Sequence, residues 1–130
     1  MDLRADFDFQ EEYLLVTASG EFTLHAALRL LKQTIDTANE KGIKRVLVDC
    51  FAMYGGLSVF ERYALGAEVA KYALIKEPHT RLAIVGIAPT IDGFAVKVAE
   101  NRGLTTASFG TNKDALTWLK CFPNEAQRFK

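Results

Sequence analysis

The sequence has few of the residues and patterns that assign a chain to a specialised class of protein. It has only two cysteines and two histidines in 130 residues, and their positions match no metal-binding spacing. No apolar run approaches the roughly 18 residues needed to span a bilayer. Sixteen basic residues balance sixteen acidic ones and lie scattered, without a basic patch. We therefore expect no metal, no cofactor, no nucleic-acid partner and no membrane insertion.

The first residues of the sequence carry acids and lack the apolar core of a secretion signal, which predicts a cytoplasmic protein. In that compartment Cys50 and Cys121 would be reduced thiols. The hydrophobic fraction of 49% and the charged fraction of 25% are typical of a globular domain with a packed core. The length predicts one domain, which we place at 1–121, followed by a short tail at 122–130.

Apolar patterning predicts five strands. A period of two over 3–9 indicates a half-buried strand, and a short polar link to the apolar run at 13–18 predicts an antiparallel hairpin. Three more strands are expected at 44–50, 81–87 and 105–109. The apolar centre of the 44–50 segment is typical of a parallel strand that is covered on both faces.

Helical spacing predicts four helices between and after these strands. The first starts at the N-cap Thr23 and stops near Gly42, and the others are expected at 59–76, at 91–102 and from Thr111 to Leu119. Strands that alternate with helices imply right-handed crossovers. The predicted fold class is therefore α/β: a single domain with a mixed, mostly parallel sheet of about five strands, an N-terminal antiparallel hairpin and about four helices.

The junction between the 44–50 strand and the second helix is the candidate binding site. Open α/β sheets place ligands and partners beyond the carboxyl ends of their strands. Connecting segments are usually polar, but this one carries large apolar residues around a glycine pair. We predict that the following residues bind a partner or a ligand: Asp49, Phe51, Met53, Tyr54, Gly55, Gly56, Leu57 and Ser58.

The helix at 59–76 is apolar on two sides and therefore needs two packing partners. One stripe consists of Phe60, Tyr63, Ala67, Ala70 and Leu74, and the other of Leu65, Val69 and Tyr72. The sheet can cover one side. A neighbouring helix, a second copy of the chain or an apolar ligand could cover the other. We prefer a homodimer and assign Leu65, Val69 and Tyr72 to the exposed binding side.

Four strings of the sequence carry a resemblance to a known family: VTASGEFT at 16–23, RVLVD at 45–49, GGLS at 55–58 and ALTWL at 115–119. With this order of strands and helices, the chain resembles the STAS domain (sulfate transporter and anti-sigma-factor antagonist). It is most similar to the stand-alone SpoIIAA-like proteins of bacteria. The resemblance implies a SpoIIAA-like fold and a non-enzymatic regulatory module that binds a protein partner.

Ser58 has both a regulatory and a structural interpretation. In the family, a partner kinase phosphorylates a serine in an Asp-Ser-Ser-Gly loop, and Ser58 lies where that serine would fall when counted from Asp49. Here Leu57 replaces the preceding Asp, and Val59 the following Ser. The resemblance implies phosphorylation at Ser58, at a helix N-terminus that suits a phosphate. The Ser-x-x-Glu capping box formed with Glu61 explains the same serine as a plain helix cap.

The residues also leave a second function open. The chain could carry or sense a small apolar or amphipathic ligand, bound under the 51–57 loop with the two-sided helix as one wall. No glycine-rich phosphate loop, nucleophile elbow or Cys-x-x-Cys motif is present. Asp49 has no second acid close to it in sequence with which to work in acid–base catalysis. We therefore assign no catalytic residue and expect no enzyme.

Overall fold

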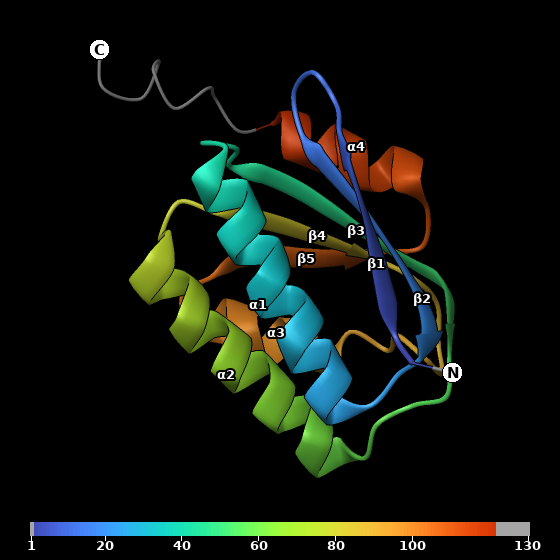
Figure 1. The fold of residues 1–130 in the computed structure, drawn as a ribbon. Helices are drawn as coiled ribbons and strands as arrows, with labels where there is room; N and C mark the ends of the chain where they lie inside the picture. Colours follow the sequence, from blue (N-terminus) through green and yellow to red (C-terminus); the bar gives the residue numbers. More distant parts are fainter. Residues whose placement is uncertain (1, 122–130) are drawn as a thin grey trace.

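The computed structural model describes residues 2–121, which form a five-stranded sheet flanked by four helices (Figure 1). The strand order is β1-β2-β3-β4-β5, with β1 antiparallel to β2 and the other neighbours parallel. The strands are β1 Arg4–Phe9, β2 Leu14–Glu21, β3 Arg45–Tyr54, β4 Arg81–Val85 and β5 Thr105–Phe109. The helices are α1 Leu24–Glu40, α2 Val59–Lys76, α3 Phe94–Asn101 and α4 Asn112–Lys120. The predicted α/β fold class is confirmed, and the predicted tail at 122–130 lies outside the described residues.

The two faces of the sheet are covered unequally. Helices α1, α2 and α3 pack over one face and bury the larger cluster, to which Val46 and Val48 of β3 contribute. Helix α4 lies on the other face, where Leu47 packs with Ala115 and Leu119. Successive residues of a strand point to opposite faces, so β3 supplies both cores in turn. This explains why its centre is apolar throughout.

The helix ends follow the local signals in the sequence. The hydroxyls of Thr23 and Thr111 accept hydrogen bonds from the first turns of α1 and α4. Gly42, just beyond α1, has φ +69°, a left-handed conformation that L side chains rarely adopt. The predicted caps at these positions are confirmed, because capping depends on residues close together in sequence.

Several predicted boundaries are wrong. Strand β3 does not stop at residue 50, and residues 51–54 of the expected apolar turn are strand. It continues because β2 also continues, past the predicted end at 18, and pairs Glu21 with Tyr54. Strand β4 ends at Val85 rather than 87, and α3 begins at Phe94 rather than 91. Gly93, with φ +86°, precedes α3 in a left-handed conformation that no helix can include.

A β-bulge in β3 decides which side chains reach the surface. Thr17 pairs with Asp49, but Ser19 pairs with Ala52, so β3 has one extra residue at this point. Cys50 and Met53 point towards the core under α1–α3. Phe51 and Tyr54 remain 49% and 50% exposed. The bulge therefore leaves two large aromatic side chains in solvent at the end of a strand.

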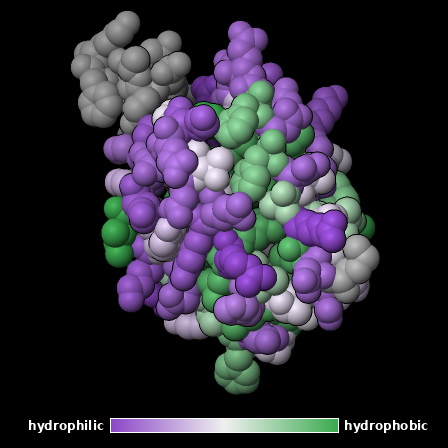
Figure 2. All heavy atoms as spheres, viewed as in Figure 1, coloured by the Kyte–Doolittle hydropathy of each residue, from purple (hydrophilic) through white to green (hydrophobic). Residues whose placement is uncertain are grey.

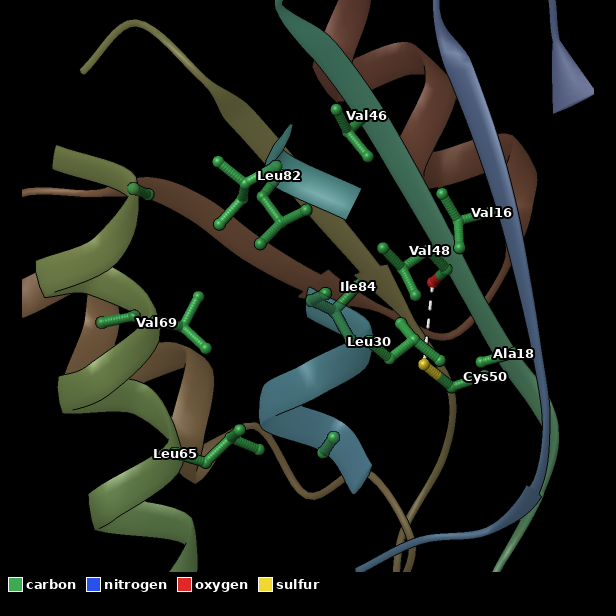
Figure 3. Packing of buried hydrophobic residues seen from close by; sticks show 14 of the residues in the cluster. Val16, Ala18, Leu30, Val46, Val48, Cys50, Leu65, Val69, Leu82 and Ile84 are labelled. Atoms are coloured by element: carbon green, nitrogen blue, oxygen red, sulfur yellow. Dashed lines mark hydrogen bonds between the residues drawn. The ribbon is translucent and has the colours of Figure 1, made fainter. Parts of the chain in front are cut away.

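Helix α2 buries two of the three residues that the sequence analysis assigns to its exposed side. Leu65 and Val69 point into the core (Figure 3) and are only 6% and 3% exposed. Tyr72 is half-buried beside α1, where its hydroxyl donates to Asp36 Oδ1 at 2.6 Å. The prediction that these three residues form the exposed side is wrong. The outward side instead carries Phe60, which is 87% exposed.

Candidate functional site

The end of the molecule where the parallel strands point carries most of its exposed large hydrophobic side chains. Nine such side chains are well exposed among residues 2–121, and seven belong to the end of β3, the first turns of α2, the β4–α3 connection or the start of α3. They are Phe51, Tyr54, Val59, Phe60, Tyr63, Ile87 and Phe94. A concentration of apolar side chains of this kind marks an interaction surface more often than chance exposure.

Asp49 holds the backbone at the bulge. Its Oδ1 accepts a hydrogen bond from the backbone amide of Phe51 at 3.0 Å. Its Oδ2 accepts from the side-chain amide of Asn112, at the start of α4, at 3.2 Å. Both carboxylate oxygens are thus engaged in fixing the end of β3 against α4. This arrangement positions Phe51 and needs no acid–base role for Asp49.

Ser58 begins α2 in a complete capping box. Its hydroxyl accepts from the amide of Glu61 at 3.1 Å, and the Glu61 carboxylate accepts from the amide of Ser58 at 2.9 Å. The Ser58 side chain is exposed and stands at the amino end of an 18-residue helix. The geometry combines a structural cap with an accessible hydroxyl at the positive end of a helix dipole.

Arg62 is the residue of this region that the sequence reasoning missed. It is 7% exposed, and its guanidinium donates to the carbonyls of Leu57, Pro89 and Thr90 at 3.0, 2.9 and 3.1 Å. It also pairs with Asp92 Oδ1 at 3.3 Å. These contacts hold the start of α2 against the β4–α3 connection. One feature of the sequence could have revealed Arg62. It lies three residues before Leu65, and residues three apart share one face of a helix, which here is the buried face.

A cavity of about 80 Å³ lies between the sheet and helices α1–α3. Its wall is almost entirely apolar, and Cys50, Met53, Leu65 and Val69 contribute to it, with Arg62 at one side. A volume of roughly 10–15 Å³ is enough to hold one buried water molecule. Larger cavities with apolar walls tend to stay dry or to bind small apolar molecules. Phe51 and Tyr54 do not line the cavity.

The predicted site residues therefore fall into two groups rather than one patch. Phe51, Tyr54, Gly55, Gly56 and Ser58 are exposed at the carboxyl edge, with Asp49 half-buried beneath them. The side chains of Met53, Leu57, Leu65 and Val69 pack into the core cluster or against it. Tyr72 also packs against this cluster, and its hydroxyl reaches Asp36 of α1.

Two further features of residues 2–121 bear on chemistry. No three histidine, cysteine, aspartate or glutamate side chains within this range come together as metal ligands would. None of the helices described for it combines the length and apolar character that crossing a bilayer requires.

Comparison with solved structures shows that the fold is SpoIIAA-like. An anti-sigma factor antagonist from Mycobacterium paratuberculosis superposes with a TM-score of 0.62 at 18% identity, over 92% of this chain and 95% of that chain. An uncharacterized protein from Shewanella loihica with a SpoIIAA-like fold gives 0.56 at 23% identity, over 91% and 93%. Family models and curated proteins gave no match. At these identities the likeness establishes the fold, and the predicted resemblance in fold is confirmed.

Proposed function

We propose that this chain is a non-enzymatic regulatory module of the cytoplasm that binds a protein partner through the carboxyl edge of its sheet. The observation that carries the proposal is the concentration of exposed aromatic and aliphatic side chains at that edge, led by Phe51 and Tyr54. The similarity in fold to an anti-sigma factor antagonist supports the same reading. Affinity would come from these apolar anchors rather than from charge, since the chain has no net charge.

The anchors stand on a rigid support, which favours binding. The hydrogen bonds of Asp49 hold Phe51 and the start of α4, and those of Arg62 hold the β4–α3 connection against α2. A surface that is already ordered loses less conformational entropy when it binds. We expect Phe51 and Tyr54 to act as hot-spot residues whose truncation costs about 2 kcal/mol or more of binding free energy.

Affinity capture with matched baits tests the partner-binding proposal. Phe9 provides the control, because it is 47% exposed, as Phe51 is, but lies on β1 away from the carboxyl edge. A partner retained by wild type and by Phe9→Ser, and lost by Phe51→Ser, is the expected result. The captured protein is then purified, and its affinity is measured for wild type, Phe9→Ser and Phe51→Ser. Equal affinity for the Phe51→Ser and Phe9→Ser variants would remove the carboxyl edge from the proposal.

The proposal includes phosphorylation of Ser58 as the regulatory step. Its exposed hydroxyl lies at the amino end of α2, where a phosphate would add about 1.5–2 negative charges. The same charge would stand beside the Glu61 carboxylate that closes the capping box. Modification would thus change both the charge and the local order of the binding edge. Mass spectrometry of cell-derived protein that finds Ser58 unmodified in every growth condition would count against this step.

Variants of Ser58 distinguish its role as the N-cap of α2 from its proposed role as a phosphorylation site. Ser58→Ala should lower the free energy of unfolding by about 1 kcal/mol, because Glu61 loses its cap acceptor. Ser58→Asp should keep stability near wild type, since aspartate is also a good N-cap. If the aspartate variant folds normally but binds the captured partner with altered affinity, the switch is supported.

The cavity favours a second candidate function, that of a carrier or sensor of a small apolar or amphipathic ligand. Its apolar wall and its volume of about 80 Å³ are the specific observation. The ligand would sit beneath α2 rather than under Phe51. Native mass spectrometry of freshly purified protein should then show a copurified small molecule. A Leu65→Phe variant that fills the cavity should lose that molecule yet still bind the protein partner.

The proposed partners include a second copy of this chain. The exposed apolar side chains of α2 support self-association, because covering Val59, Phe60, Tyr63 and Ile75 with a second surface would remove apolar area from water. Sedimentation velocity over a range of concentrations tests it. A single monomeric species throughout the micromolar range would overturn homodimerisation.

A further inference from the structure

The apolar cavity between the sheet and helices α1–α3 extends across most of the sheet. Its wall includes Ala18 of β2, Val48 of β3, Ile84 of β4 and Thr106 of β5. Neighbouring strands lie about 4.8 Å apart, so these four strands span roughly 14 Å. Figure 3 shows part of this interior, where Val69 points from α2 towards the sheet. A volume of about 80 Å³ that reaches all four strands is narrow and elongated rather than round.

The shape of the cavity favours a chain over a ring. A compact engineered apolar cavity of about 150 Å³ takes up a benzene ring. The present cavity has about half that volume, and this volume is distributed across several strands. An unbranched alkyl chain can follow such a space, whereas a ring needs its full width at one point.

The polar side chains of the wall already have partners within the chain. The Thr106 hydroxyl donates to the carbonyl oxygen of Leu82 at 2.7 Å. The Arg62 guanidinium donates to three backbone carbonyls and to Asp92 Oδ1. A charged group placed inside would lose its water without gaining a partner, which is strongly unfavourable. The interior therefore suits an uncharged apolar molecule.

Asp92 marks the place where the cavity meets solvent. Among the described residues that form the wall, it alone is exposed. Its Oδ1 accepts hydrogen bonds from Arg62 at 3.3 Å and from the amide of Phe94 at 3.0 Å. On the side viewed in Figure 2, helices α1 and α2 present mainly hydrophilic side chains over the cavity. At the opening beside Asp92 the charge of Arg62 is thus balanced, and a carboxylate faces solvent.

From these features we infer that the cavity binds an unbranched alkyl chain without a charged end, such as a primary alcohol whose hydroxyl lies at Asp92. The inference rests on the ligand-carrier function proposed above and names the class of ligand. A hydroxyl can donate a hydrogen bond to the Asp92 carboxylate. A fatty acid is disfavoured, because its carboxylate would meet a like charge at the opening.

Methyl NMR of the whole wild-type chain provides the test, with 1-hexanol, hexanoate and benzene as test ligands. Ile84 and Ile91 line the cavity, whereas Ile75 and Ile87 are exposed outside it and serve as internal controls. 1-Hexanol should shift the δ1-methyl signals of Ile84 and Ile91 and leave the two controls unchanged. Hexanoate, which is ionised at neutral pH, and benzene should each bind at least about tenfold more weakly.

An Asp92→Asn variant tests the source of the preference for the alcohol over the acid. Without the carboxylate, the Arg62 cation has lost its counter-charge, so the affinity for hexanoate should rise about tenfold, towards that for 1-hexanol. Asp114→Asn is the matched control, because Asp114 is also exposed but belongs to α4, on the other face of the sheet. Its affinities should equal those of wild type.

Each contrary result overturns a different part of the proposal. If none of the three ligands shifts Ile84 or Ile91, the carrier function and the inferred ligand class both fall. Hexanoate that binds wild type as tightly as 1-hexanol does would overturn only the uncharged class, and benzene that does so would overturn only the chain shape. Equal hexanoate affinity of Asp92→Asn and wild type would remove Asp92 as the cause of selectivity.

Discussion

The guanidinium of Arg62 donates to the carbonyl oxygen of Pro89 at 2.9 Å, across 27 positions of sequence. The same group bonds to Leu57 and Thr90 and pairs with Asp92. One nearly buried cation thus joins the start of α2 to the β4–α3 connection. This link fixes how α2 sits against the β4–α3 connection at the carboxyl edge of the sheet.

Replacing Arg62 by leucine should strongly destabilise the protein. The change would leave several carbonyl groups without their donor, and Asp92 without its partner, at a cost of about 3 kcal/mol of unfolding free energy. Arg62→Lys should recover only part of the loss, because a lysine cannot reproduce the branched donor geometry. Urea unfolding measures both, with the exposed Arg29→Leu as control. A loss under about 0.5 kcal/mol would show that Arg62 is dispensable.

Gly66→Ala should also destabilise the fold, although alanine is the better helix former. A Cβ at Gly66 would stand 2.3 Å from the carbonyl oxygen of Ala95 and 2.9 Å from the Val98 side chain, so α2 and α3 would have to separate. We expect a net loss of about 2 kcal/mol after a helix-propensity gain of about 1 kcal/mol. Gly110→Ala, where a Cβ meets nothing within 4 Å, is the matched control for thermal unfolding.

The two cysteines should differ sharply in reactivity. Burial, and then the charge of Asp49, raise the pKa of the Cys50 thiol to about 12, so it stays protonated and covered. Cys121 is exposed. A thiol reagent at pH 8 should therefore modify one thiol per native chain and two per unfolded chain. Cys121→Ser should abolish the fast reaction, and fast modification of that variant would contradict the burial of Cys50.

The ion pair between Lys44 and Glu77 should make stability depend on pH in the acid range. Burial by itself would raise the pKa of Glu77, but bonds to the Lys44 ammonium and the His79 amide outweigh it and lower the pKa below the ordinary 4.5. A depressed native pKa means that the contribution is complete above pH 4.5 and is lost as the pH falls through the native value. Glu77→Gln should be less stable at pH 7, and its difference from wild type should shrink towards pH 2. If the difference in unfolding free energy between wild type and Glu77→Gln does not change with pH, the destabilisation comes from altered packing and not from the lost ion pair.

Local patterns were enough to predict the order of strands and helices and most helix ends. The capping box of Ser58 and Glu61 and the stop at Gly42 involve residues within four positions of one another, so the printed sequence contains the whole interaction. The alternation of strands and helices then permits few topologies, since right-handed crossovers are strongly preferred. The mixed α/β class was predictable for these reasons, whereas the SpoIIAA-like fold was implied by the resemblance of four sequence strings to that family.

The boundaries at the binding edge were less predictable. The end of β3 depends on where β2 ends, and the bulge opposite Ala18 leaves no local mark in the sequence. The apolar stretch after Cys50 therefore suggested a turn, whereas pairing with β2 keeps residues 51–54 extended. Phe51 and Tyr54 are exposed because of that strand pairing, and not because either side chain by itself favours contact with water.

By itself the sequence determined the α/β class, the helix caps and the two apolar stripes of α2, because periodicity and capping are short-range properties. Only the tertiary structure decided which of these side chains face inward. Leu65 and Ala70, from different stripes, are both buried and Phe60 is exposed, because the outcome depends on what the sheet, α1 and α3 offer them. It also decided that Arg62 is buried, because its acceptors come from a segment far along the chain. The surface available to a partner is thus set by long-range packing, which leaves Phe51 and Tyr54 of β3 and Phe60 and Tyr63 of α2 outside the core.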